Sequence, residues 1–217
     1  MSIDPIQIVY TGVGMPRKMV FNGNEMNTGI CKDEVEQIIV NDESCEGDGV
    51  ANTNFHGGPD RVVCVYPYEH YGKWEKEFQT SLPPCAFGEN LTIKGLTESE
   101  ACIGDIYQVG EAVLQITQGR IPCQTISKRT GIQPILQRIV ETGFTGYFFR
   151  VLQSGIIRKD STVSLIQRHP LQVTVLFANQ ILFHDKKNES AIRQILEVDE
   201  LASVWRDKLS KQLESIS

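Results

Sequence analysis

The amino-acid sequence predicts a mainly β fold: a closed β-barrel followed by a small α-helical appendage. Up to about residue 169, many short apolar or β-branched runs alternate with glycine-containing turns, and two segments have helical spacing. Such spacing is typical of a closed, barrel-like sheet rather than of repeated βαβ units. After Pro170 the spacing of the apolar residues becomes helical. We therefore expect a barrel domain over residues 1–169 and a helical domain over residues 170–217.

The chain has the composition of a soluble globular protein, with 217 residues of which 41% are hydrophobic and 22% charged. This length can bury a proper core, either as one domain with an appendage or as two small domains. The 21 basic and 27 acidic residues give a net charge of −6, which disfavours a nucleic-acid groove but allows a local basic pocket. No apolar run reaches about 18 residues, and residues 1–5 lack a basic-then-apolar signal peptide. We expect a cytoplasmic protein whose partners are neither membranes nor nucleic acid polymers.

The expected strands follow from periodicity. Residues 6–10 alternate and are β-branched, the pattern of a strand with one buried face. Residues 62–66 are nearly continuously apolar, which anchors the preceding loop on the core. Residues 21–27 are rich in Asn and Gly and predict a turn between two strands. Further strands are expected near Val35, at residues 37–40 and 91–93, within 103–110, and at 113–117 and 147–152.

Helical spacing predicts two helices between these strands, over residues 67–78 and 132–140. In the appendage, Asn188 is expected to cap one helix and Asp199 a last one with apolar residues at four-residue steps. Residues 177–183 would form the first of three helices. The appendage shows no catalytic cluster, so we interpret it as a packing or association surface, which leaves a homodimer open.

The six cysteines are at positions 31, 45, 64, 85, 102 and 123. No two lie within four residues of each other, which excludes the paired spacing of a structural zinc site. A cytosolic chain of this size neither needs disulfides nor keeps them oxidised. We expect six free thiols.

Cys123 is the cysteine with an electrostatic reason to react. A thiol needs nearby positive charge to become the thiolate, which is both the nucleophile and the metal ligand. Arg120 lies three residues earlier, and the Pro122 ring restricts the backbone next to the cysteine. The alternative is that Cys123 is one more small buried hydrophobe.

Three other positions are candidate site residues. In the loop over residues 56–61, two glycines and a proline bring the backbone close to whatever the loop faces, with His56 and Arg61 at its ends; the alternative is a tight surface turn. Asn90 could hydrogen-bond a ligand or cap its own turn. Arg150 is a charge inside an apolar run, so it must be paired or face a polar cavity.

Five separated motifs, at residues 56–67, 87–92, 103–105, 120–123 and 143–152, resemble the MOSC domain family, and within it the YiiM-like subgroup. The appendage is similar to the three-helix domain of that subgroup, so the likeness spans nearly the whole chain. Gly119 stands where the family usually has a proline before the arginine, which predicts a looser turn.

The resemblance implies a pyruvate-kinase-barrel-like fold that handles the molybdenum cofactor (molybdopterin), with Cys123 as the molybdenum ligand or a sulfur-carrying thiol. Related proteins reduce N-hydroxylated compounds, and the subgroup is associated with protection against bases such as 6-hydroxylaminopurine. A molybdopterin needs a phosphate clamp, hydrogen bonds to its pterin edge and a soft thiolate. The residues expected to supply the positive rim and the directional polar contacts are Lys32, Arg61, Arg120, Arg150, His56 and Asn90.

Reduction of an N-hydroxyl group consumes two electrons. The sequence carries no flavin, haem or iron–sulfur motif, so we expect a separate electron-donor protein and a small N-hydroxylated substrate. Two alternatives stay open: a metal-free enzyme in which Cys123 attacks with His56 as its base, and a non-catalytic carrier of sulfur or of the cofactor. Pyridoxal phosphate enters only by family association, because MOSC domains also occur fused to sulfurase domains that this chain has no room for.

Overall fold

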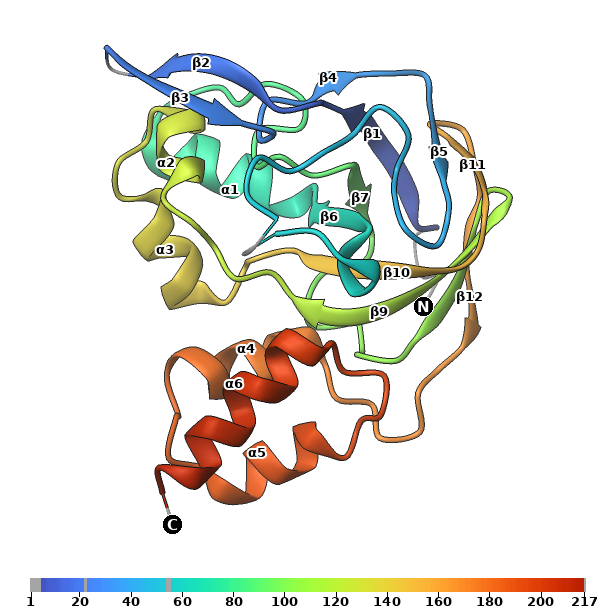
Figure 1. Cartoon of the computed structure of the whole chain (residues 1–217), viewed down its shortest axis with the longest axis vertical. Coiled ribbons are helices and arrows are strands. Elements are labelled where there is room, and N and C mark those ends of the chain that lie inside the picture. Colours follow the sequence, from blue (N-terminus) through green and yellow to red (C-terminus); the bar gives the residue numbers. More distant parts are fainter. Residues whose placement is uncertain (1–4, 22, 54–55, 217) are drawn as a thin grey trace.

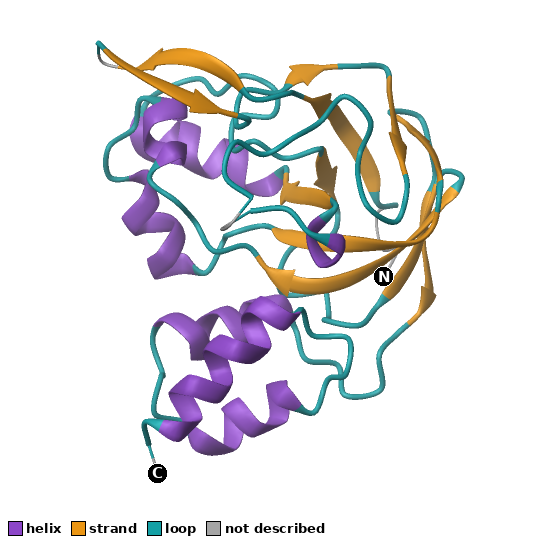
Figure 2. Cartoon of the chain, viewed as in Figure 1, coloured by secondary structure: helices purple, strands orange, loops and turns teal. Residues whose placement is uncertain are grey.

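The structure, a computed structural model, describes residues 5–21, 23–53 and 56–216 (Figures 1 and 2). Residues 1–4 of the signal-peptide argument and residue 22 of the expected turn lie outside the described residues. The strands are β1 (Gln7–Val13), β2 (Arg17–Phe21), β3 (Asn24–Thr28), β4 (Asp33–Glu34), β5 (Gln37–Val40), β6 (Val63–Pro67), β7 (Leu91–Lys94), β8 (Ile106–Val109), β9 (Ala112–Gly119), β10 (Tyr147–Gln153), β11 (Gly155–Arg158) and β12 (Val163–Gln167). The helices are the 3-10 turn η1 (Pro59–Arg61), α1 (Glu69–Phe78), α2 (Thr125–Thr130), α3 (Ile135–Thr142), α4 (Val175–Phe183), α5 (Glu189–Leu196) and α6 (Ser203–Glu214).

The prediction of a mainly β fold with a helical appendage is confirmed. Eight strands form one curled sheet in the order β12-β8-β9-β10-β6-β7-β1-β4 (Figure 1). All neighbours are antiparallel except β6 and β7, which run parallel. Unlike the expected closed barrel, the sheet keeps two edges within the described residues, at β12 and β4. It stays open because β4 has only two residues and β5 then pairs with β11 instead of extending the sheet.

The sheet and the appended helices share one apolar cluster. Val65 of β6 and Ile116 of β9 belong to the same cluster as Ile192 of α5 and Trp205 of α6, and all four are fully buried. A second cluster of aliphatic and aromatic side chains, with Tyr66 stacked on Phe87, fills the space towards α1, α2 and α3. The helices therefore pack onto the barrel as part of its core, as Figure 2 shows for the purple layer beneath β9.

Most of the helix predictions are confirmed. The spacing over residues 67–78 and 132–140 corresponds to α1 and α3, and α4 forms where the first helix of the appendage was expected. Asn188 caps α5 as predicted, because its side chain accepts a hydrogen bond from the Ala191 amide. Helix α2 was not anticipated. Among the described residues, no helix combines the length and apolar character that crossing a membrane requires.

The prediction that Asp199 caps the last helix is wrong. The helix α6 begins at Ser203, because residues around Asp199 form a turn that Arg206 ties down through the carbonyl oxygens of Leu196 and Val198. The flanking residue Ala202 has no side chain that could cap the helix. The carboxylate of Asp60 instead accepts the hydrogen bond from the Ser203 amide.

Gly119 lies where the barrel meets the appended helices. A Cβ atom at this position would lie 2.3 Å from the Asn179 side-chain oxygen and 3.1 Å from the Trp205 ring. The absence of a side chain thus lets α4 and α6 approach the end of β9. Packing against Asn179 and Trp205 therefore requires glycine at position 119, where the family usually has proline.

We expect Gly119→Ala to destabilise the protein by about 1–3 kcal/mol, because the new methyl group overfills a packed contact between buried side chains. The measurement is the free energy of unfolding in urea. The control is Gly72→Ala in α1, where nothing lies within 4 Å of the added Cβ; this change should stabilise the helix by about 0.5–1 kcal/mol. Equal stability of Gly119→Ala and wild type would contradict the packing role.

Candidate functional site

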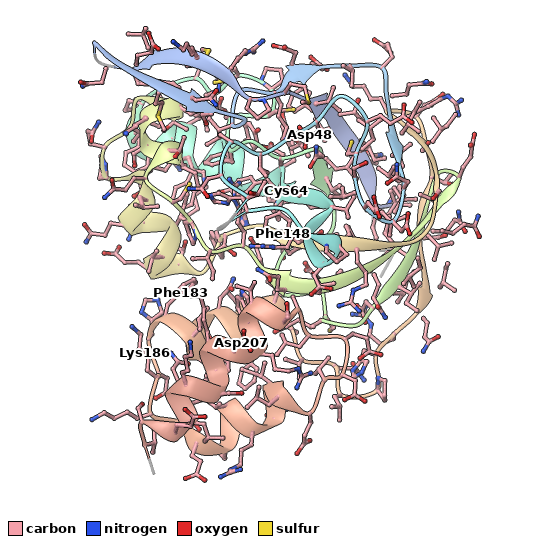
Figure 3. All side chains as sticks on the ribbon, viewed as in Figure 1. Asp48, Cys64, Phe148, Phe183, Lys186 and Asp207 are labelled. Carbon is pink, nitrogen blue, oxygen red and sulfur yellow. The ribbon has the colours of Figure 1, made fainter. Side chains whose placement is uncertain are left out.

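A cavity of about 730 Å³ lies between the curled sheet, the loops above it and the C-terminal helix. Figure 3 labels three of its lining residues, Asp48, Cys64 and Phe148, which follow one another through the centre of the molecule. The walls come from the end of β3, residues 48–52, the loop at 56–62, β6, residues 118–125 around the end of β9, β10, and α6.

The structure brings six of the seven predicted site residues to this cavity and leaves Arg150 outside it. The strands β6, β9 and β10, which border the cavity, are far apart in sequence but adjacent in space, because β6 pairs with β10 and β10 with β9. The six that line the cavity are Lys32, His56, Arg61, Asn90, Arg120 and Cys123.

Cys123 is half-buried, whereas the other five cysteines are buried, and all six are free. It stands in the short connection between β9 and α2, and its carbonyl oxygen accepts a hydrogen bond of 3.1 Å from the Ile126 amide. Cys64 also lines the cavity, but burial raises the pKa of its thiol. Cys123 is therefore the cysteine with both access and a polar setting.

Arg120 is fixed at both ends. Its backbone amide donates to the Gly146 carbonyl oxygen at 2.9 Å, and its guanidinium donates to the Phe87 carbonyl oxygen. Burial alone would lower the pKa of Arg120, but the negative charges of nearby ionisable groups, Cys64, Cys123 and Glu89 when deprotonated, outweigh it, so the pKa is raised. The guanidinium is thus a permanent positive charge beside Cys123, and the turn after Gly119 is held in place by these hydrogen bonds.

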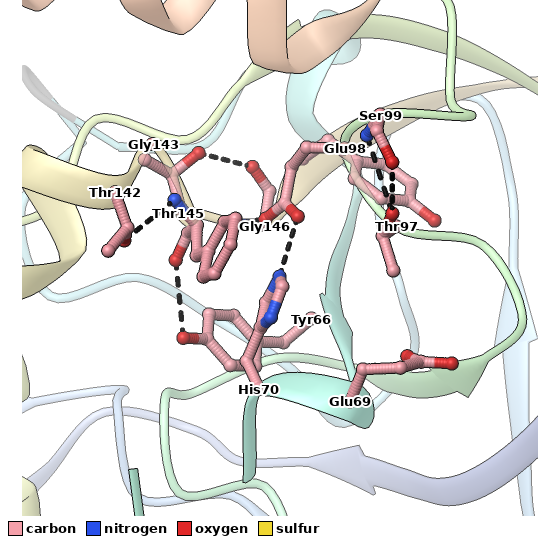
Figure 4. A network of polar contacts seen from close by, with 12 residues as sticks. Tyr66, Glu69, His70, Thr97, Glu98, Ser99, Thr142, Gly143, Thr145 and Gly146 are labelled. Atoms are coloured by element: carbon pink, nitrogen blue, oxygen red, sulfur yellow. Dashed lines mark hydrogen bonds and ion pairs between the residues drawn. The ribbon is translucent and has the colours of Figure 1, made fainter. Parts of the chain in front are cut away.

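A buried polar network holds the turn that anchors Arg120 (Figure 4). The Gly146 amide donates to one Glu98 carboxylate oxygen at 2.7 Å, and the other oxygen lies 2.6 Å from Nε2 of His70. His70 stacks on Phe144 with ring centroids 4.1 Å apart. Because Glu98 and His70 are both buried, their pairing satisfies groups that would otherwise be costly to desolvate.

Asn90 braces the floor of the cavity. Its side-chain oxygen accepts from the Cys64 amide at 3.0 Å, and its amino group donates to the Gly12 carbonyl at 3.2 Å and to Asp48 at 2.9 Å. It is 2% exposed. The structure therefore places Asn90 as a support that joins β1, β6 and the loop at Asp48, rather than as the cap of its own turn.

Lys32 forms an ion pair with Asp48, and the two side chains are only 5% and 13% exposed. Besides Lys32 and Asn90, the Gly14 amide also donates to the Asp48 carboxylate, at 2.9 Å. The positive charge of Lys32 is thus largely neutralised within the protein.

His56 and Arg61 approach the cavity from the two ends of the glycine loop. Gly57 and Gly58 have φ angles of 77° and 94°, values that favour glycine, and η1 follows directly. Burial lowers the pKa of His56, and the charges of Arg120 and Arg61 lower it further. His56 is therefore neutral at neutral pH.

Arg150 lies in a second hollow, of about 600 Å³, on the other side of the glycine loop. Its guanidinium donates to Asp60 at 2.8 Å and to the Glu200 carbonyl oxygen at 2.9 Å. Its place in an apolar strand required a partner or a polar cavity; the structure shows the ion pair with Asp60, and the side chain also lines this hollow.

The cavity includes residues that the sequence analysis did not single out, among them Gln118, Phe148, Val204 and Lys208. Gln118 is 1% exposed, and its amino group donates to the Gly119 carbonyl oxygen at 3.0 Å. Its own oxygen has no partner within the described part of the chain. The amide orientation is fixed because a carbonyl can only accept, so the side-chain oxygen of this cavity residue is left as a buried acceptor. The signal in the sequence that could have indicated Gln118 was a polar residue in a buried strand.

The sequence from residue 52 to 164 matches the MOSC domain, and this match covers more than half of the chain. The chain belongs to the MOSC family. Residues 173–215 of this MOSC protein match a second family, the YiiM-like 3-alpha helix domain. The match begins just before α4 and ends just after α6.

Several relatives resemble the MOSC protein along most of its length. An uncharacterised protein of Bacillus subtilis, YflK, is 39% identical over 98% of this chain and 96% of its own. Protein YiiM of Escherichia coli is 35% identical over 85% of this chain and 84% of its own. A protein named reductase from Gibberella moniliformis is 32% identical over 74% of this chain, which corresponds to 29% of that protein.

Solved structures share the fold. The crystal structure of YiiM from Geobacillus stearothermophilus has a TM-score of 0.82 at 32% identity and covers 96% of this chain and 100% of its own. YiiM from Escherichia coli has a TM-score of 0.77 at 30% identity and covers 98% of this chain and 93% of its own.

The cavity residues fit a molybdopterin. Cys123 offers one soft donor with access to the cavity, and Arg61 and Arg120 offer positive charge for an anionic group. The unpartnered oxygen of Gln118 suits an N–H donor of a pterin edge. Phe148 is a half-buried ring in the wall against which a flat heterocycle could lie.

Anion binding in this cavity should tighten as the pH falls from about 8 to about 5.5, because an anion beside His56 favours its protonated form and raises its lowered pKa. Each unit of that rise allows up to about tenfold tighter binding at low pH. The measurement is titration calorimetry with sulfate, which keeps its charge over this range. The pH dependence should disappear in His56→Gln and persist in His184→Gln, a change on the exposed end of α4. A pH dependence that survives His56→Gln would rule out this histidine as its source.

Proposed function

We propose that this MOSC protein binds the molybdenum cofactor and reduces small N-hydroxylated compounds, 6-hydroxylaminopurine among them, with Cys123 as the molybdenum ligand. The observation that carries the proposal is the position of Cys123, the one cysteine that is not buried, in a cavity it shares with Arg61 and Arg120. Family membership supports a link to this cofactor. A relative whose name is reductase supports reduction as the class of reaction.

The reaction converts an N-hydroxyl group and two electrons and two protons into an amine and water. When bound, the molybdenum cofactor supplies the two-electron oxygen-atom chemistry. Cys123 would hold the metal through its thiolate, and the fixed charge of Arg120 stabilises that thiolate. His56, neutral at the cavity wall, can take up a proton at an imidazole nitrogen and deliver it to the departing oxygen.

The remaining roles follow from this chemistry. Arg61 would bind the anionic end of the cofactor, and Gln118 would accept a hydrogen bond from the heterocycle. The electrons would come from a separate donor protein. We also propose that this MOSC protein is cytoplasmic. Arg150 would act on the site through Asp60 rather than by contact.

Cys123→Ser should abolish molybdenum binding, with a loss of affinity greater than about 100-fold, since even outer-shell partners of a metal typically contribute about 10–100-fold. The measurement is the molybdenum and pterin content of protein from a molybdenum-replete host, together with protection of cells against 6-hydroxylaminopurine. Cys64→Ser is the matched control, because that thiol also lines the cavity but is buried.

The control variant should keep its metal and the Cys123→Ser protein should keep its thermal midpoint. Molybdenum retained in Cys123→Ser would remove the ligand role. Wild-type protein that contains neither metal nor pterin, with a persulfide or an alkylation-sensitive activity at Cys123, would favour a carrier or a metal-free cysteine enzyme instead.

A further inference from the structure

The last helix of the chain forms part of the cavity wall. Val204 and Lys208 of α6 line the same cavity as Arg61, Arg120 and Cys123. They are four residues apart, so they lie on one face of the helix, one turn above the other. The appended helices thus contribute side chains to a site whose other residues come from the barrel.

A carboxylate of the barrel binds the first turn of α6. Asp60, in the turn η1, accepts a hydrogen bond of 3.1 Å from the amide of Ser203, the first residue of α6. Its other oxygen accepts from Arg150 at 2.8 Å, and the same Arg150 nitrogen donates to the Glu200 carbonyl oxygen at 2.9 Å. This latch, formed by Asp60 and Arg150, caps a helix that begins 143 residues later in the chain.

The latch is adjacent to a cavity residue. Asp60 and Arg61 are neighbours in η1, and the oxygen of the Asp60 peptide accepts a hydrogen bond of 2.6 Å from Thr117 of β9. Asp60 therefore holds α6 while Arg61 lines the cavity. One rigid turn sets the position of both the helix and the arginine.

Lys208 brings a cation to this wall. It is exposed, and it forms no hydrogen bond or ion pair with any described residue. Lys32, which also lines the cavity, already has a carboxylate partner in Asp48. An oxyanion in the cavity would therefore be bound by Lys208 together with Arg61 or Arg120. Arg61 is the arginine next to Asp60 of the latch.

We propose that Lys208, with Arg61, forms a subsite for the phosphate monoester group of the ligand, and that the latched C-terminal helix is a component of the binding site. The inference rests on the proposed function only in placing the ligand in this cavity. Two ligands could supply the phosphate: the pterin side of the cofactor, or a purine nucleotide as substrate. Both offer oxyanion acceptors that a lysine ammonium binds as a point charge.

The test compares phosphorylated and unphosphorylated probes on metal-free protein. The probes are 6-hydroxymethylpterin and its phosphate ester, and adenosine and adenosine monophosphate, with binding followed by calorimetry. Wild-type protein should prefer at least one phosphorylated probe over its parent, and which pair shows the preference identifies the source of the phosphate. Lys208→Gln should weaken binding of that phosphate ester by about tenfold, the contribution of one charge-assisted hydrogen bond, and leave the parent unchanged.

The matched control is Lys211→Gln, an exposed lysine of the same helix that does not line the cavity, which should leave every affinity unchanged. In an Asp60→Ala background, which breaks the latch, Lys208→Gln should have little further effect, because the helix no longer holds the lysine in place. That non-additivity separates binding through a docked helix from a general effect of surface charge.

Three results would overturn the proposal: no preference of the wild type for either phosphate ester, an unchanged affinity in Lys208→Gln, or an equal loss for the ester and its parent. The outcome is separate from the molybdenum question. Cys123→Ser should retain the phosphate preference, so a protein that never binds molybdenum could still show this subsite. Conversely, a protein that binds molybdenum but does not prefer a phosphate ester would refute the subsite and leave the cofactor assignment in place.

Discussion

The hydrogen bonds of the Asn90 side-chain amide are the interactions on which the rest of the site depends. Its three hydrogen bonds tie β1, β6 and the loop that carries Asp48 to one point beneath the cavity. Asp48 in turn binds Lys32 and the Gly14 amide. In a buried setting a lost partner leaves an unsatisfied group and costs about 1–3 kcal/mol, so each member of this set enforces the position of the others. The cavity can be hollow because its floor is rigid.

Most buried charged groups of this protein have a partner, and the Lys32–Asp48 pair has one even at the cavity wall. The buried carboxylates Glu89 and Glu98 are satisfied by Tyr71, Thr92, His70 and backbone amides. Arg150 is held by Asp60, and Lys32 by Asp48. Arg120 differs, because its guanidinium donates to a neutral carbonyl oxygen instead of a carboxylate. The cavity therefore has a permanent positive charge close to its one half-buried thiol, Cys123.

The sequence carried the local parts of the site and not the parts made by tertiary packing. Cys123, Arg120 and the glycine loop were found because their chemistry is written within a few neighbouring residues. Lys208 could not be found in this way, because it looks like any exposed lysine on an amphipathic helix and reaches the cavity only when α6 docks. The cap of α6 was misassigned to Asp199 for the same reason: the acceptor, Asp60, comes from a different part of the fold. The openness of the sheet also depended on a distant event, the pairing of β5 with β11.

The shared core explains why the appended helices and the site belong together. Gly119 ends β9 one residue before Arg120, and the space left by its missing side chain is occupied by Asn179 and Trp205 of the appended helices. The same strand end therefore positions the arginine of the site and receives the helices. On the other side, Asp60 joins η1 to α6 while Arg61 lines the cavity. With two such joints, the docking of α6 and the positions of Arg61 and Arg120 depend on the same packed contacts.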